Sequence, residues 1–321
     1  MTQNIQPKNL ASSLSALEPK TKAPTNARVL DGWISRAQDQ LHTAGPRLGW
    51  LVASTVVIAA LQRAVGNDDA PLFLLKGGTM LQYRLSGMSR TTTDVDGLVR
   101  GEIDEFLTRL DAALQEPWGP LTLERSEAET IIVPHKIVKP RRFDIKVSLK
   151  GKTWRKVKVE IAADEGEAGA QPERIAAPTL AGFGLPAPET LASISLRYQI
   201  AQKIHAASDP HDPPRFENDR ARDVVDLLLL RELCEVSGSP SNAEIRDAVL
   251  DVFNVRAKEA IETNGIPRPW PVAITAHQHW TASYNSAAKS ADVPLSLPEA
   301  VENTNGWLKL IDDAHSTPPG A

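Results

Sequence analysis

Residues 75–97, LKGGTMLQYRLSGMSRTTTDVDG, contain the pattern that decides the fold of this chain. The apolar run 72–75 is typical of a short buried strand, and the KGGT of residues 76–79 turns it into a helical pattern. Paired glycines let the backbone approach a phosphate, Lys76 adds a positive charge, and Thr79 is suited to cap a helix whose amides favour anions. This stretch predicts a phosphate-binding turn between a strand and a helix.

Two carboxylates, Asp94 and Asp96, follow the turn with one residue between them. Residues i and i+2 of a strand point to the same face, so both side chains aim at one point, as a hard divalent cation requires. Each motif alone is more often a plain turn or a solvated loop. Together they resemble the nucleotidyltransferase fold of DNA polymerase beta, where a glycine turn holds the triphosphate and Asp-x-Asp holds magnesium ions.

The resemblance narrows to one family. KGGT at 76–79, R-x-T-x-D-x-D at 90–96, Lys203 and R-D-x-x-D at 222–226 resemble the AbiEii/AbiGii nucleotidyltransferase toxin family, which includes the mycobacterial MenT toxins. These matches span residues 72–230, about half of the chain. The resemblance implies the toxin of a toxin–antitoxin or phage-defence pair, with a cognate antitoxin as partner. Its implied reaction transfers a nucleoside monophosphate from an NTP to the 3′ end of tRNA, which blocks translation.

The same resemblance assigns roles to individual residues. The expected catalytic residues are Asp94, Asp96, Glu160, Lys203 and Asp223, and the first three are expected to hold two magnesium ions. The expected nucleotide-binding residues are Lys76, Gly77, Gly78, Thr79 and Arg90. From the residues alone, Lys203 could equally extend along apolar surface, and Arg222 could pair with Asp226 on a helix surface.

A β-hairpin is predicted where residues 143–150 and 157–161 alternate polar and apolar side chains about a turn at 151–153. Its polar face carries Glu160 near the end of one strand and Asp144 on the partner strand. The family's third acidic residue is commonly Asp, so both carboxylates are candidates for that role. The surrounding VKVEIA resembles the family's strand and favours Glu160.

The hairpin is also the most basic part of the chain. Residues 134–158 contain ten Lys or Arg and one acid, a net charge of about +9, whereas the whole chain carries −4. The remaining residues therefore sum to about −13, so a polyanion should be drawn to the hairpin. We expect RNA to bind near its turn, through Lys150, Lys152, Arg155 and Lys156.

Other functions are compatible with the same fold. A nucleotidyltransferase acting on a protein or on a small molecule of the aminoglycoside type would use the same carboxylates, but a cationic drug needs an acidic pocket. A non-catalytic nucleic-acid-binding protein on a decayed transferase fold would be expected to have lost a carboxylate. All three candidate carboxylates are present.

Length and composition predict an α/β (α+β) protein with two lobes. The 321 residues are 41% hydrophobic and 24% charged, enough to bury a large core. We expect a mobile tail over 1–27, a nucleotidyltransferase domain with a mixed sheet over 28–175, and a helical domain over 176–321. Helical patterns cover 101–114, 189–207, 218–233, 242–262, 272–288 and 298–314.

Residue types also bear on the location of the protein and on further metal binding. One cysteine, Cys234, excludes an intramolecular disulfide, and the first thirty residues lack the order of a signal peptide, so a cytoplasmic location is expected. The uncharged stretch 48–62 is shorter than the ~20 residues that span a bilayer, which predicts a buried helix and no membrane partner. His211 and Asp212 lie in a Pro-rich loop without a second histidine nearby, which argues against a metal site there.

Overall fold

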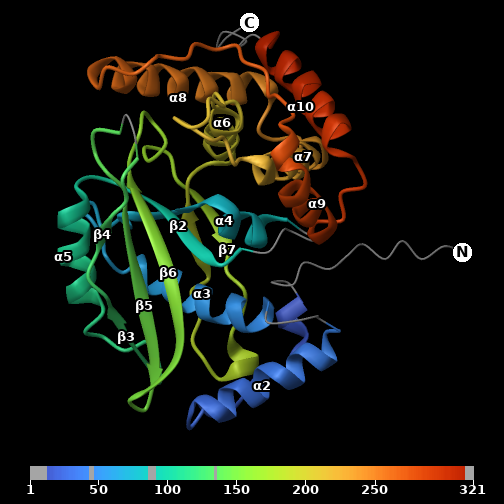
Figure 1. The fold of residues 1–321 in the computed structure, drawn as a ribbon. Helices are drawn as coiled ribbons and strands as arrows, with labels where there is room; N and C mark the ends of the chain where they lie inside the picture. Colours follow the sequence, from blue (N-terminus) through green and yellow to red (C-terminus); the bar gives the residue numbers. More distant parts are fainter. Residues whose placement is uncertain (1–12, 43–46, 86–91, 134–135, 315–321) are drawn as a thin grey trace, which may run out of the picture.

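The computed structural model describes residues 13–42, 47–85, 92–133 and 136–314, and it shows a mixed α/β protein built on one sheet (Figure 1). Among these residues the sheet has eight strands in the order β3-β5-β6-β2-β1-β8-β7, with β4 paired to β5. Two neighbouring pairs are parallel, β2 with β6 and β1 with β8, so the predicted mixed sheet is confirmed. The strands are β1 (Phe73–Lys76), β2 (Asp94–Val99), β3 (Leu121–Arg125), β4 (Glu129–Thr130), β5 (Arg141–Leu149), β6 (Lys152–Ala163), β7 (Glu173–Ala176) and β8 (Thr190–Ser193).

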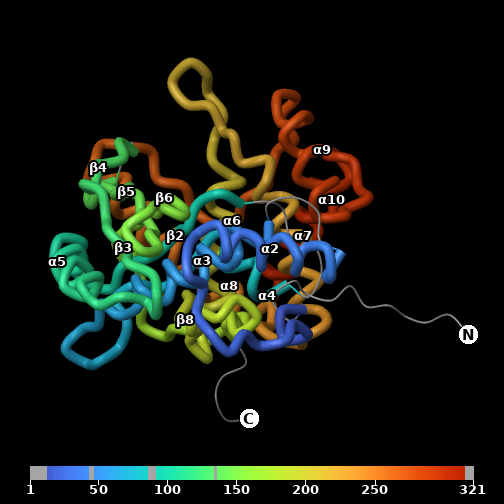
Figure 2. The backbone as a smooth tube through the Cα atoms, turned by 90° about the horizontal axis from the view of Figure 1, so that it is seen from below, coloured from blue at the N-terminus to red at the C-terminus, as the bar shows by residue number. Residues whose placement is uncertain are grey.

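Helices gather into two groups around the sheet. Figure 1 shows α6 to α10 together at one end of the strands, whereas α2, α3 and α5 lie along the sheet. Figure 2 views the molecule from below, and there α2 and α3 lie side by side in front of α6 and α8. The helices are α2 (Ala27–Gln40), α3 (Arg47–Leu61), α4 (Gly77–Arg84), α5 (Ile103–Ala113), α6 (Leu196–Ala207), α7 (Ala221–Ser237), α8 (Asn242–Glu262), α9 (Thr281–Ser290) and α10 (Leu297–Asp312), with 3₁₀ turns η1 (Leu14–Ala16), η2 (Ala181–Phe183) and η3 (Gln278–Trp280).

Helix α3 is the buried helix that its uncharged sequence predicts. Every residue from Leu48 to Leu61 except Trp50 is buried, and the helix contacts β5, β6 and α5. The buried hydroxyl of Thr55 is paired, since it lies 3.0 Å from the Tyr83 hydroxyl of α4 and donates to the Leu51 carbonyl. In the part of the chain that the structure describes, no helix is both long and apolar enough to cross a membrane.

Strands β5 and β6 form the predicted hairpin. The turn consists of Lys150 and Gly151, with φ of 50° and 73°. Two consecutive left-handed residues match the right-handed twist of paired strands. The turn therefore lies one residue earlier than the expected 151–153.

The N-terminal segment and the start of the helical lobe differ from expectation. Leu14 and Leu17, inside the segment predicted to be a tail, are 1% and 8% exposed and belong to the core. Residues 190–193 form β8 instead of the first turn of the helix predicted over 189–207, because they pair with both β1 and β7. The sheet thus draws on residues on both sides of position 175.

Candidate active site

The glycine turn joins β1 to α4 and is fixed from two sides. Gly77 has φ +70°, and a Cβ built there would lie 2.2 Å from Oδ2 of Asp96, so both conformation and space exclude a side chain. Its amide donates to Oε1 of Gln199 at 3.0 Å. Gln199 is 2% exposed and comes from α6, so the helical lobe holds the turn.

Thr79 does not cap the helix, contrary to prediction. Helix α4 begins at Gly77 with Lys76 as its N-cap, which places Thr79 on the buried face. The Thr79 hydroxyl donates to the carbonyl of Asp94 at 2.6 Å. Thr79 therefore ties α4 to the first residue of β2, next to the candidate carboxylates.

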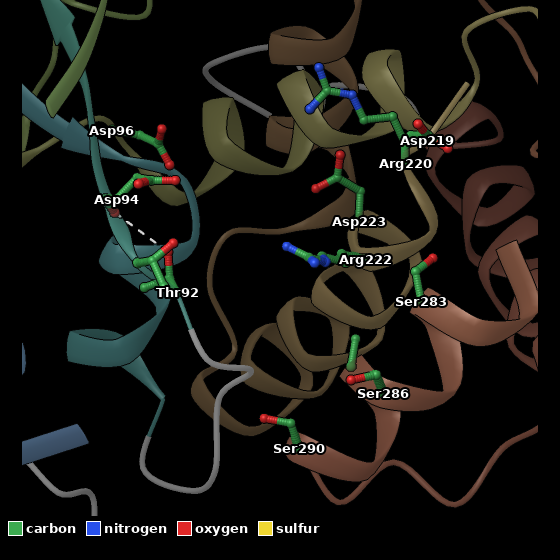
Figure 3. Close-up of a pocket in the computed structure, with 12 residues that line it drawn as sticks. Thr92, Asp94, Asp96, Asp219, Arg220, Arg222, Asp223, Ser283, Ser286 and Ser290 are labelled. Atoms are coloured by element: carbon green, nitrogen blue, oxygen red, sulfur yellow. Dashed lines mark hydrogen bonds between the residues drawn. The ribbon is translucent and has the colours of Figure 1, made fainter. Parts of the chain in front are cut away.

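Asp94 and Asp96 lie on one face of β2, as their spacing predicts, and line a pocket of about 800 Å³. Figure 3 shows their carboxylates pointing into this pocket, opposite α7 and α9. The antiparallel pairing of β1 and β2 sets Lys76 across from Asp96. The turn and the carboxylate pair are thus neighbours in space as well as in sequence.

Burial dominates the electrostatics of Asp96. Desolvation raises the pKa of Asp96 to about 6, while Lys76 opposes the rise and Glu160 adds to it. Burial likewise lowers the pKa of Lys76. Because burial destabilises the carboxylate form of Asp96, a cation bound beside it would be stabilising.

Glu160 stands on the strand next to the Asp pair. The parallel pairing of β2 and β6 sets Glu160 beside Asp96, and Arg142 binds Glu160 at 2.7 Å. Asp144 lies one strand farther away and pairs with Lys156 at 2.6 Å. This order across the sheet favours Glu160 over Asp144 as the third carboxylate.

The three candidate ligands are not gathered around one point. Within the described residues, the one group of three acidic, His or Cys ligand atoms that all lie within 4.8 Å is Glu217, Asp219 and His279. Oxygen donors suit a hard divalent cation, so the Asp94, Asp96 and Glu160 set fits one in chemistry. Arg142 contacts Glu160 through Oε1, so the other oxygen, Oε2, is the one available to such an ion.

Lys203 is buried and contacts Asp223, one of the residues that line the pocket. Its ammonium group binds Asp223 at 2.7 Å and Asp226 at 2.6 Å, and the three side chains are 8%, 11% and 0% exposed. The suggested surface pair between Arg222 and Asp226 is wrong, because Asp226 faces inward. Lys203 also lies near enough to Asp96 to oppose the rise of its pKa.

The far wall of the pocket is the side opposite Asp94 and Asp96, and the sequence did not predict most of it. It is lined by Arg220, Arg222 and Asp223 at the start of α7 and by three serines of α9, Ser283, Ser286 and Ser290. Figure 3 shows Arg222 and Asp223 facing Asp94 across the pocket. Spacings of three and four place the serines on one helix face, but only the fold shows that this face meets the pocket.

A second missed group fastens the helical lobe to the end of β6. Glu165 makes two bonds to Arg256, at 2.6 and 2.9 Å, and a third to Lys136. Burial alone would raise the pKa of Glu165, but Arg256 and Lys136 outweigh burial and hold that pKa well below its usual range. No sequence signal marks these residues, since Glu165 lies 29 positions from Lys136 and 91 from Arg256.

Comparison with known proteins identifies the family. The family model for the nucleotidyl transferase AbiEii toxin of type IV toxin–antitoxin systems matches residues 59–303, about three quarters of the chain. The chain belongs to the AbiEii family. Among solved structures, MenT4, a nucleotidyltransferase toxin from Mycobacterium tuberculosis H37Rv, aligns over 83% of this chain and 94% of its own, at 17% identity and a TM-score of 0.39. No curated protein matches the sequence.

Membership of the AbiEii family establishes the general activity of the chain. The AbiEii chain is a nucleotidyltransferase toxin of a type IV toxin–antitoxin system, which implies a cognate antitoxin. Nucleotidyltransferases use an NTP and a divalent metal ion, and the carboxylates and the glycine turn described above are suited to both. Arg90, an expected nucleotide ligand, lies outside the described residues.

The positive charge of the basic hairpin in the AbiEii chain is balanced by more acidic side chains than the sequence suggests. Several of its cations pair with acids from distant segments, including Lys136 with Glu259, Lys146 with Glu124 and Arg155 with Asp31. Of the four expected RNA ligands, Arg155 and Lys156 make ion pairs, whereas Lys150 and Lys152 are exposed and make none with any residue that the structure describes. The fold therefore compensates much of the charge that is concentrated along the sequence.

Proposed function

We propose that this AbiEii toxin transfers a nucleoside monophosphate from an NTP to the 3′ end of a tRNA in the cytoplasm, and so blocks translation. The observation that carries the proposal is the pocket itself. Asp94 and Asp96 face Arg220 and Arg222 across it, beside a glycine turn. Carboxylates suit the metal ions, and guanidinium groups suit the phosphates of a nucleotide.

Asp94, Asp96 and Glu160 would hold two magnesium ions. Bound there, the ions would neutralise charge on the phosphates and lower the pKa of the acceptor hydroxyl. Glu160 would accept the proton of that hydroxyl. The turn formed by Lys76, Gly77 and Gly78 would take the triphosphate, since Lys76 carries a positive charge and the start of α4 favours anions.

Lys203 and Asp223 would act together on the nucleotide. Asp223 lines the pocket, and Lys203 binds it. Because Lys203 is only 8% exposed and is bound to both Asp223 and Asp226, it would hold the Asp223 carboxylate in place at the pocket. We assign Lys203 a positioning role and Asp223 the contact.

The acceptor RNA would run from the pocket along the hairpin. Lys158 lies opposite Asp94, and Lys152 lies six residues before it in β6. At about 3.3 Å per residue this is roughly 20 Å, a length that a base-paired acceptor stem with its 3′ end in the pocket would cover. Lys150 and Lys152 would contact its phosphates.

Labelling of RNA tests the proposal. The protein is incubated with magnesium, each labelled NTP in turn and total RNA, and the products are separated on a denaturing gel. The wild type should label a band of tRNA size, and the isosteric variants Asp94→Asn and Asp96→Asn should not. Near-normal labelling by either folded variant would refute the assignment, and a labelled protein band would indicate a protein acceptor instead.

A matched pair of variants decides which residue is the third carboxylate of the active site. Glu160→Gln should abolish labelling, whereas Asp144→Asn, on the neighbouring strand and equally isosteric, should retain it. The reverse result would assign the role to Asp144.

A further inference from the structure

A group of histidines lies beside the rim of the pocket. The loop before α7 contains His211, and the segment before α9 contains His277 and His279. The ring centroid of His211 lies 4.7 Å from that of His277 and 4.5 Å from that of His279. The sequence argued against a metal site at His211 because no second histidine is near along the chain, and the fold removes that objection.

His279 also faces two carboxylates. Its Nε2 lies 3.6 Å from Oδ1 of Asp219 and 4.0 Å from Oε1 of Glu217. The side chains of Glu217 and Asp219 are 59% and 78% exposed, so both can rotate. Tetrahedral zinc, with ligand bonds of 2.0 to 2.1 Å, separates its ligands by about 3.3 Å, so small rotations complete the geometry.

Asn218 holds the backbone of this site rigid. It is fully buried between the two acids, and its side chain donates to the carbonyls of Ala207 and Asp209. Its amide donates to Nδ1 of His211 at 3.2 Å, and its carbonyl accepts from Trp280 and from His279. Because Trp280 satisfies that carbonyl, His279 can exchange its bond there for a metal ion.

We propose that Glu217, Asp219 and His279 bind one divalent transition-metal ion, with zinc as the best match. An imidazole nitrogen with two carboxylate oxygens suits zinc, whereas magnesium keeps an all-oxygen shell rich in water. The stacked ring of His211, 20° from parallel, fixes the plane of His279.

The ion would fasten the far wall of the active-site pocket. Glu217 and Asp219 lead into α7, and His279 leads into α9, the two helices that line this wall. Figure 3 places Asp219 beside Arg220, across the pocket from Asp94 and Asp96. The site is thus separate from the catalytic carboxylates, and the inference holds whatever the acceptor of the transfer is.

Metal affinity tests the inference without relying on activity. The tag-free chain is prepared with Asp94→Asn and Asp96→Asn, which remove the catalytic ligands, and is stripped with a chelator. Zinc affinity is then measured by competition with a chromophoric chelator, and cobalt is added to record the visible absorption of a tetrahedral site. We expect one zinc ion per chain, a tetrahedral cobalt spectrum, and a melting temperature raised by zinc but not by equal magnesium.

Three variants in the same background locate the ion. His279→Ala and Asp219→Asn should each weaken zinc binding at least about tenfold and abolish the cobalt spectrum. His42→Asn should leave both unchanged, because His42 is exposed at the end of α2 and Asn tolerates its left-handed φ of 51°. Absence of one tight zinc equivalent in the parent, or unchanged affinity in the soluble His279→Ala and Asp219→Asn variants, would overturn the proposal.

Discussion

Replacing Lys203 with methionine should cost much of the stability of the fold. The substitution keeps the apolar stem but removes the charge that two carboxylates share, at 2.7 Å from Asp223 and 2.6 Å from Asp226. Because all three side chains are at most 11% exposed, water cannot replace the lost partner. Removing one partner of a buried ion pair costs about 3–5 kcal/mol, against a typical total of about 5–15 kcal/mol.

Urea unfolding followed by circular dichroism measures this loss. With a denaturant slope of about 3 kcal/mol per molar, Lys203→Met should lower the urea midpoint by at least about 1 M. Lys146→Met is the matched control, since Lys146 and Glu124 form an exposed pair whose loss should cost under about 1 kcal/mol.

Neutralising the carboxylates provides the decisive comparison. The triple variant Lys203→Met, Asp223→Asn, Asp226→Asn should recover a large part of the lost stability, because uncompensated buried charge causes most of the loss. If Lys203→Met shifted the midpoint no more than Lys146→Met does, the charge cluster would not be buried as described.

Three further predictions follow from the site. The raised pKa of Asp96, about 6, means that the folded state binds its proton more tightly than the unfolded state, so stability falls as pH rises from about 4 to 6. Asp96→Asn should therefore be more stable than the wild type at pH 7.5 and show a smaller advantage at pH 4.5 in urea titrations; an equal advantage at both would contradict the assignment. Gly77→Ala should destabilise the fold by about 1–2 kcal/mol from its positive φ alone and weaken NTP binding in calorimetry, whereas Gly101→Ala, which has φ +82° but open space around it, should affect stability only. Lys150→Ser with Lys152→Ser should flatten the salt dependence of tRNA affinity by about 1.5 units, at 0.7–0.9 per contact, and an unchanged slope would place the RNA elsewhere.

The local parts of the site could be predicted from the sequence, because they depend on short-range periodicity. Period two placed Asp94 and Asp96 on one face and revealed the hairpin, although its turn, predicted at 151–153, begins one residue earlier at Lys150. Thr79 was misjudged because a hydroxyl can serve as a helix cap or as a buried donor, and only the packing of α4 on β2 decides between them.

The long-range parts could not be predicted, because no local pattern encodes them. Glu165 and Arg256 are 91 positions apart, and His211 and His279 are separated by two helices. Residues 190–193 form a strand because β1 and β7 are there to pair with, which outweighs their local helical pattern. The pairing of the hairpin's cations could not be predicted either, since the acidic partners of several come from other segments of the chain.

The bond between Gln199 and Gly77 has a mechanical consequence. Gln199 lies in the first turn of α6, and Ile194, just before that helix, donates to the carbonyl of Leu75 at 3.0 Å. Separating the helical lobe from the glycine turn would therefore leave buried polar groups unpaired. The turn and the start of α6 should move as one unit in any rearrangement of the pocket.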